Sequence, residues 1–139
     1  LETLELRAVK QSENALVVAE FLEKRLGTVL FPGLPNHPQH DLAMSQMRYA
    51  GPIFSFEIDG GRENAMAMLN ALTLIDISNN IGDSKSLMTH PASSTHSSLS
   101  QEVPADMGGT EGMVRINVGL EDPQDLIDDL DQALTTVGL

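Results

Sequence analysis

Cysteine, basic residues and long apolar runs are absent or scarce in this sequence of 139 residues. The lack of cysteine excludes disulfides, thiolate metal sites and thiol nucleophiles, and it fits a reducing, cytoplasmic location. Only eight Lys and Arg stand against 20 Asp and Glu, and the basic residues are scattered. Because nucleic acids and anionic membranes are bound through positive surfaces, the net charge of −12 argues against both as partners. No apolar run approaches the roughly 20 residues of a membrane-spanning helix.

The start of the sequence lacks an initiator methionine, a basic leader and a signal-like apolar core. We therefore expect a piece of a longer protein. Its length is that of one domain, residues 1–139, and its hydrophobic fraction of 41% is sufficient for a buried core.

The spacing of apolar residues predicts a small α/β fold. Helical spacing predicts a long helix over 1–26 ended by Gly27, and a further helix carries Ala65, Met68, Leu69 and Leu72. Alternation predicts strands over 53–58 and 113–118, and short β-prone runs begin at Thr28 and Leu74. Asn36 or His37 is expected to cap a helix with Pro38 at its first position. Asp122 is expected to cap a last helix, with Pro123 at its first position. We expect an α+β sandwich, in which helices pack on an antiparallel or mixed sheet of about four strands.

The segment 74–96 is the most unusual stretch. A short apolar run leads into a long segment rich in Ser, Thr, Asn and His, which contains too few apolar residues to form core. Polar segments delivered by a scaffold are where binding or catalysis is usually found. The sequence therefore predicts a functional loop here.

Nucleophile and metal sites are disfavoured by their context. His37 and His40 could meet on one helical turn, but capping explains them better than a metal site, and we expect no metal. No nucleophile elbow surrounds the serines near His96. Lys85 lies among small polar residues with no apolar wall to lower its pKa, which favours a solvated loop lysine.

Arg115 is the exception among these candidates. It is the only basic residue in the last third of an acidic chain, and the alternation of 113–118 places it on the face opposite the core. A guanidinium held there can grip a carboxylate with two parallel hydrogen bonds. A surface salt bridge with a nearby acid is the alternative, and the residues alone leave both open.

Three motifs, in order, carry a family resemblance. They are Phe-Pro-Gly-Leu-Pro-Asn-His-Pro-Gln-His at 31–40, Gly-Asp-Ser-Lys-Ser-Leu-Met-Thr-His-Pro-Ala-Ser-Ser-Thr-His at 82–96, and Gly-Met-Val-Arg-Ile-Asn-Val-Gly-Leu-Glu-Asp at 112–122. Together they closely resemble the C-terminal domain of the pyridoxal-phosphate (PLP) enzymes of cysteine and methionine metabolism. The resemblance implies the small domain of an aspartate-aminotransferase-like fold. Within the family, Leu-Ile-Asp-Ile-Ser-Asn-Asn-Ile-Gly-Asp at 74–83 looks most like the O-succinylhomoserine sulfhydrylase branch.

The resemblance also implies roles for single residues. Arg115 would bind the α-carboxylate of an amino-acid substrate, Asn80 and Ile81 would occupy the turn beside it, and Thr95 would lie near the same pocket. Asn80 departs from the family, which more often has Ser there. We expect no catalytic, cofactor-binding or metal-binding residue in this chain.

In this family the lysine that forms a Schiff base with PLP and the groups that hold the phosphate belong to a larger preceding domain. Lys10, Lys24 and Lys85 do not match that lysine, so the chain alone should be inactive. The resemblance implies a full-length homotetramer that makes homocysteine from O-succinylhomoserine and sulfide in methionine biosynthesis. A cystathionine γ-synthase or γ-lyase, and a stand-alone carboxylate-binding or interaction module, are the alternatives.

Overall fold

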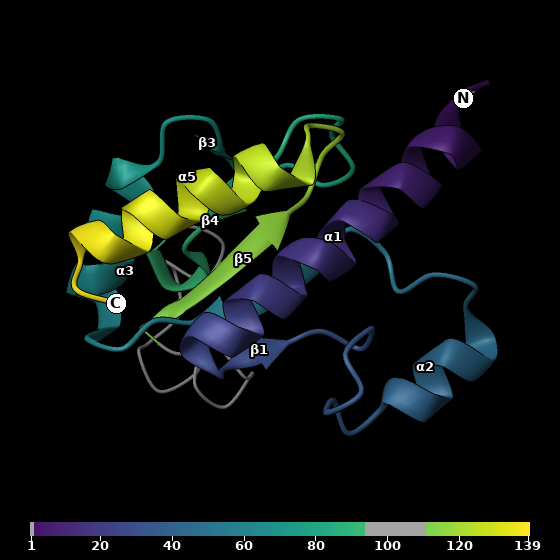
Figure 1. Ribbon diagram of the computed structural model, residues 1–139, viewed down its shortest axis with the longest axis horizontal. Helices are drawn as coiled ribbons and strands as arrows, with labels where there is room; N and C mark the ends of the chain where they lie inside the picture. Colours follow the sequence, from purple (N-terminus) through teal and green to yellow (C-terminus); the bar gives the residue numbers. More distant parts are fainter. Residues whose placement is uncertain (1, 94–110) are drawn as a thin grey trace.

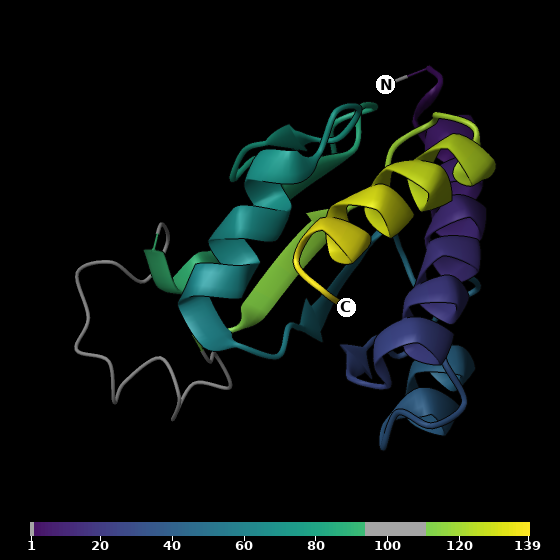
Figure 2. The ribbon, with the colours of Figure 1, turned by 60° about the vertical axis from the view of Figure 1, so that its left-hand side comes forward.

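The protein forms a sheet with its main helices on one face, as a computed structural model that describes residues 2–93 and 111–139 shows (Figure 1). The second view shows α1, α3 and α5 side by side over the same face of the sheet (Figure 2). The helices are α1 (Leu4–Leu26), α2 (His40–Gln46), α3 (Gly61–Ala71), the 3-10 helix η1 (Pro91–Ser93) and α5 (Pro123–Thr136). The strands are β1 (Val29–Leu30), β2 (Ile53–Glu57), β3 (Asp76–Ile77), β4 (Leu87–Thr89) and β5 (Met113–Asn117).

The sheet is mixed and has the order β1-β2-β5-β4-β3. β3 and β4 are parallel, and the other neighbours are antiparallel. The central strand β5 pairs Arg115 with Ser55 on one side and with Thr89 on the other. Because directly paired residues share a face, these three side chains form a row across the sheet.

One hydrophobic core fills the space between the sheet and the helices. The alternation predicted for β2 and β5 is confirmed, since Phe54, Phe56, Val114 and Ile116 are buried there. The helices contribute Val18 and Leu22 from α1, Ala65, Met68 and Leu69 from α3, and Leu126, Leu130, Ala133 and Leu134 from α5. No helix in the described part of the chain is long and apolar enough to cross a membrane.

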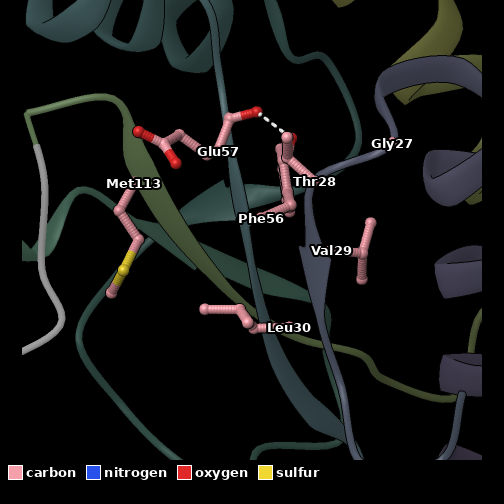
Figure 3. Close-up of a pocket in the computed structure, with 7 residues that line it drawn as sticks. All are labelled: Gly27, Thr28, Val29, Leu30, Phe56, Glu57 and Met113. Atoms are coloured by element: carbon pink, nitrogen blue, oxygen red, sulfur yellow. Dashed lines mark hydrogen bonds between the residues drawn. The ribbon is translucent and has the colours of Figure 1, made fainter. Parts of the chain in front are cut away.

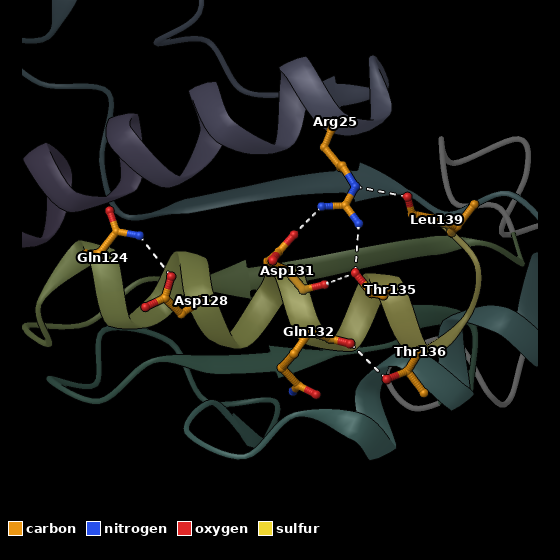
Figure 4. A network of polar contacts seen from close by, with 8 residues as sticks. All are labelled: Arg25, Gln124, Asp128, Asp131, Gln132, Thr135, Thr136 and Leu139. Atoms are coloured by element: carbon orange, nitrogen blue, oxygen red, sulfur yellow. Dashed lines mark hydrogen bonds and ion pairs between the residues drawn. The ribbon is translucent and has the colours of Figure 1, made fainter.

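The predicted ends of the long helices are confirmed. Gly27 ends α1 with φ 75°, the left-handed conformation that glycine adopts without strain. Asp122 caps α5 by accepting a hydrogen bond from the Gln124 N–H at 2.8 Å. Near the C-terminal end of α5, Arg25 pairs with Asp131 and donates to the Leu139 carbonyl at 2.9 Å, which fastens α1 to α5 (Figure 4).

The predicted start of the second helix is wrong. α2 begins at His40, two residues after Pro38, and no side chain caps it. Backbone hydrogen bonds from Leu34 to Phe31, from His37 to Leu34 and from His40 to His37 form successive turns instead. In a helix starting at Pro38 the His37 carbonyl would accept from Asp41, but here it accepts from His40 in a tighter turn.

The prediction for the segment 74–96 is wrong in part. The apolar run forms only the two-residue edge strand β3, whose side chains are exposed. The polar segment that was expected to contribute no core contains β4, and all three β4 residues are buried. With β4 the sheet has five strands instead of the expected four or so. Met88 of β4 pairs with Ile116 and is a buried core residue.

Candidate carboxylate-binding site

Arg115 projects from the middle of the sheet on the face opposite the core, as its position in the sequence predicts. Its neighbours in the strand, Val114 and Ile116, are fully buried against the helices, whereas Arg115 is half-buried. Ser55 and Thr89 flank it on the adjacent strands. The central strand of the sheet thus presents a positive charge on the face opposite the main helices.

Within the described residues, the guanidinium of Arg115 makes one hydrogen bond. Its Nη2 donates to the backbone carbonyl of Asn79 at 2.9 Å. The ion pairs in the described ranges involve Arg25, Arg48, Arg62 and Lys85, so Arg115 has no acidic partner there. The surface salt bridge that the sequence left open is therefore not formed within residues 2–93 and 111–139. An arginine carries five N–H donors, so this one can still offer a fork to a bound carboxylate.

The segment 79–82 lies against Arg115. The side-chain oxygen of Asn79 accepts a hydrogen bond from the Thr89 hydroxyl at 2.7 Å, which ties the segment to β4. Asn80 and Ile81 follow with exposed side chains, and Ile81 is 65% exposed. Gly82 ends the segment with φ 82°, in the left-handed region.

The predicted site residues fall into two groups. The structure places Asn80 and Ile81 next to Asn79, whose carbonyl Arg115 contacts. Thr95 lies outside the described residues. Two further residues beside Arg115, Asn79 and Thr89, have no signal in the sequence, because the hydrogen bond between them depends on β4, which the apolar pattern does not predict.

Asn117 is a buried polar residue two positions after Arg115 on the same face of β5. Its Oδ1 accepts from the Gly82 N–H at 3.1 Å, and its Nδ2 donates to the carbonyls of Asp83 at 3.2 Å and Lys85 at 3.4 Å. The end of β5 is therefore bonded to the loop that follows Asn79. The sequence offers no local signal for these hydrogen bonds, since Asn117 and its partners in the loop are more than 30 residues apart.

The histidines that raised a metal interpretation have other partners. His37 accepts a hydrogen bond from the Gln39 N–H at 3.0 Å, and His40 Nδ1 lies 2.7 Å from the Pro32 carbonyl. In the part of the chain that the structure describes, no group of three or more His, Cys, Asp and Glu could hold a metal ion.

The three lysines do not fit the covalent binding of an aldehyde cofactor. Lys85 pairs with Asp76, and this hydrogen bond raises the pKa of the Lys85 ammonium further above its ordinary value, so the amine stays protonated. Lys10 and Lys24 are exposed on α1. A Schiff base needs a neutral amine in a shielded site, which none of the three provides.

A hollow of about 300 Å³ at the β1 edge of the sheet is a separate feature (Figure 3). Two of its lining residues are joined by a hydrogen bond, from the Thr28 hydroxyl to the Glu57 carbonyl at 2.8 Å. Among the described residues that line the hollow, Glu57 is the one that carries a charge. An anionic carboxylate ligand would be repelled there, so the hollow does not compete with Arg115 as a carboxylate site.

A family model described as "Cys/Met metabolism PLP-dependent enzyme" matches residues 1–135 of the chain. The chain belongs to this family. The resemblance in the three motifs is thereby confirmed, and so is the α/β fold class.

The relatives carry several activities in their names. The chain is 45% identical over 141 residues to an O-succinylhomoserine sulfhydrylase of Mycobacterium tuberculosis, and 41% identical over 139 residues to an L-methionine gamma-lyase of Fusobacterium nucleatum subsp. polymorphum. It covers 35% of the length of each, and 97% and 99% of this chain is matched. A crystal structure of cystathionine gamma synthase from Xanthomonas oryzae pv. oryzae, in complex with aminoacrylate and cysteine, superposes with a TM-score of 0.93 at 36% identity. That match covers 99% of this chain and 36% of the other.

Proposed function

We propose that this chain is the C-terminal, substrate-binding domain of a longer PLP-dependent enzyme that makes homocysteine from O-succinylhomoserine and sulfide. In this reaction the sulfide replaces the succinyloxy group at the γ-carbon, and succinate leaves. The chain spans about a third of the length of its relatives, so the greater part of such an enzyme would lie outside it.

The proposal depends most on Arg115. A half-buried guanidinium with one backbone hydrogen bond and no acidic partner among the described residues is suited to a bidentate bond with an α-carboxylate. Asn80, Ile81 and Thr95 would line the pocket around that carboxylate. Holding the carboxylate fixes the direction of the α-C–H bond, so Arg115 would orient the substrate for the reactive groups of the rest of the enzyme.

Pyridoxal phosphate, when bound, supplies the electron sink for this chemistry. The lysines of this chain do not fit its covalent attachment, so we propose that another part of the full-length protein holds it. The share of this chain is to bind and orient the amino acid. On its own it would catalyse nothing.

The choice of the sulfhydrylase activity over its alternatives rests on one observation, the resemblance of the segment 74–83 to the sulfhydrylase branch. The sulfhydrylase of M. tuberculosis is 45% identical, which is compatible with this choice. A cystathionine γ-synthase would use cysteine as the sulfur donor, and a γ-lyase would release an oxo acid without a donor. We propose a cytoplasmic homotetramer acting on a small amino acid, without nucleic acid or membrane partners, in methionine biosynthesis.

The test uses the full-length protein with PLP and O-succinylhomoserine. We expect homocysteine with sulfide and little cystathionine with cysteine. A preference for cysteine would reassign the enzyme to the γ-synthases, and release of an oxo acid from methionine or cystathionine would reassign it to the lyases.

The stand-alone module is the alternative of a different class. It would use Arg115 to hold some other carboxylate, and it requires that the native gene encodes this domain alone. A reading frame that continues upstream of Leu1 into a domain with a PLP-binding lysine would exclude it.

A further inference from the structure

We propose that Asn117 is a positioning residue, which holds the segment 79–82 in place beside Arg115 and so sets the affinity for the amino-acid substrate. This inference rests on the proposed function, because it concerns the same carboxylate pocket. Asn117 itself is 2% exposed and is not expected to touch the substrate.

The segment is attached to β5 at both of its ends. Arg115 donates to the carbonyl of Asn79, and Asn117 accepts from the N–H of Gly82. Alternate residues of a strand point to the same face and lie about 7 Å apart. Two side chains on the same face of one strand thus hold the two ends of the segment 79–82, and Asn80 and Ile81 lie between these attachments.

The orientation of the Asn117 carboxamide is fixed by its partners. The Oδ1 atom faces an N–H group, and Nδ2 faces the carbonyls of Asp83 and Lys85. A reversed amide would set oxygen against two carbonyls and nitrogen against an N–H, which would lose all three hydrogen bonds. The contact is therefore specific for an amide at this position.

A second buried carboxamide supports the same loop from the helix layer. Gln11 of α1 donates through Nε2 to the Asp83 carbonyl at 2.8 Å and to the Val118 carbonyl at 2.9 Å. The Asp83 carbonyl thus accepts from both Asn117 and Gln11. Since Gln11 is also buried, the loop is bonded to two elements of the rigid core.

These bonds matter because, within the described residues, the middle of the segment has only one other hydrogen bond, from the Asn80 N–H to the Ser78 hydroxyl at 3.2 Å. The side chains of Asn80 and Ile81 are exposed, so packing does not fix them. A segment 79–82 released from Asn117 would sample several positions, and the substrate would have to order it on binding. This ordering reduces substrate affinity without changing the chemical step.

The experiment uses the full-length enzyme with PLP and compares Asn117→Leu with Asn14→Leu. Leucine has nearly the shape of asparagine but no hydrogen-bonding groups. Asn14 is the matched control, because it is equally buried and donates to two carbonyls, those of Gly119 at 3.0 Å and Glu121 at 2.9 Å, but to none in 79–85. We expect Asn117→Leu to raise KM for O-succinylhomoserine about tenfold, the equivalent of about 1.4 kcal/mol, and to leave KM for sulfide unchanged.

A purely structural role would reduce the fraction of folded enzyme, which lowers apparent kcat and moves neither KM. Gln11→Met is the second variant, should Asn117→Leu not fold, and we expect a smaller rise in the same KM. An unchanged KM in both variants, or an equal rise in Asn14→Leu, would overturn the inference. If Arg115→Ala raises KM and these variants do not, only the inference fails. If Arg115→Ala leaves KM unchanged, the proposed function fails first.

Discussion

Arg115 and Asn79 are joined by a single hydrogen bond of 2.9 Å, from the guanidinium to the backbone carbonyl. The acceptor is neutral, so the bond orients the guanidinium without cancelling its charge. Asn79 is held in turn by Thr89 on the neighbouring strand. The backbone thus orients the guanidinium, and no acidic side chain in residues 2–93 and 111–139 pairs with it.

Gly82 is predicted to be important for substrate binding through its backbone. Its φ of 82° is unfavourable for any residue with a Cβ, although a Cβ there would contact nothing within 4 Å. Gly82→Ala should therefore cost about 1 kcal/mol of strain, which the turn can relieve by moving away from Asn117. We expect a several-fold rise in KM for the amino-acid substrate. Gly138→Ala, with the same φ at the end of the chain, is the control, and an equal KM in all three proteins would contradict this prediction.

Asp129 is predicted to stabilise the fold as a carboxylate. Burial alone would raise its pKa, but hydrogen bonds from the N–H groups of Thr73, Ile75 and Leu74 and from the Gln132 side chain together lower it. Asp129→Asn should reduce the free energy of unfolding by about 2 kcal/mol at pH 7, because the amide brings N–H groups against backbone N–H groups. Urea titration of this chain measures the loss. Asp128→Asn, on the exposed side of α5, should change it by less than about 0.5 kcal/mol.

The same carboxylate gives a pH dependence of known sign. Because its pKa is lowered in the folded state, its contribution is fully present above the ordinary pKa of 3.8 and is lost as the pH falls through the lower folded value. The difference in stability between the wild type and Asp129→Asn should therefore shrink below about pH 4. A difference that stays constant from pH 7 to pH 3 would contradict the assignment.

Met88 tests whether β4 belongs to the core. It is fully buried, so Met88→Ala should lower the free energy of unfolding by about 2–5 kcal/mol in urea titration. Met47, which is 41% exposed, provides the comparison. Met47→Ala should change stability by less than about 0.5 kcal/mol, and equal effects of the two substitutions would mean that β4 is not part of the core.

The chain alone should not attach pyridoxal phosphate to a lysine. Lys85 is held protonated by Asp76, and Lys10 and Lys24 are exposed. Titration of the wild-type chain with PLP should give no stoichiometric absorbance of a lysine adduct. Asp76→Asn, which frees Lys85 from its ion pair, is the comparison, and the wild type should not exceed it. A stable, specific adduct in the wild type would show that a lysine of this chain serves the cofactor.

The sequence predicts those parts of the fold whose signals are local. Neighbouring residues are sufficient to predict the apolar stripes of α1 and α5 and the alternation of β2 and β5. The alternation of β5 places Arg115 on the correct face. β4 was missed because it shows no alternation. Thr89, on the face opposite the core, is buried and donates a hydrogen bond to the Asn79 side chain, and this contact forms only after the chain has folded.

The site was predictable to a similar extent. Arg115 stands out by charge and by its place in a strand, whereas Asn117 and Gln11 act through carbonyls 32 to 107 residues away. No spacing rule covers such contacts. The roles of Asn80, Ile81 and Thr95 depend on the family resemblance, and they stay predictions.

The most direct test of the account is KM for O-succinylhomoserine in the full-length enzyme with Arg115→Ala and Arg115→Lys. We expect a rise of about a hundredfold for alanine, since a bidentate charged pair is lost, and a smaller rise for lysine, which cannot form the fork. Arg25→Lys, on the helix side of the sheet, should leave this KM unchanged. An Arg115→Ala enzyme with the KM of the wild type would show that Arg115 does not bind the substrate carboxylate.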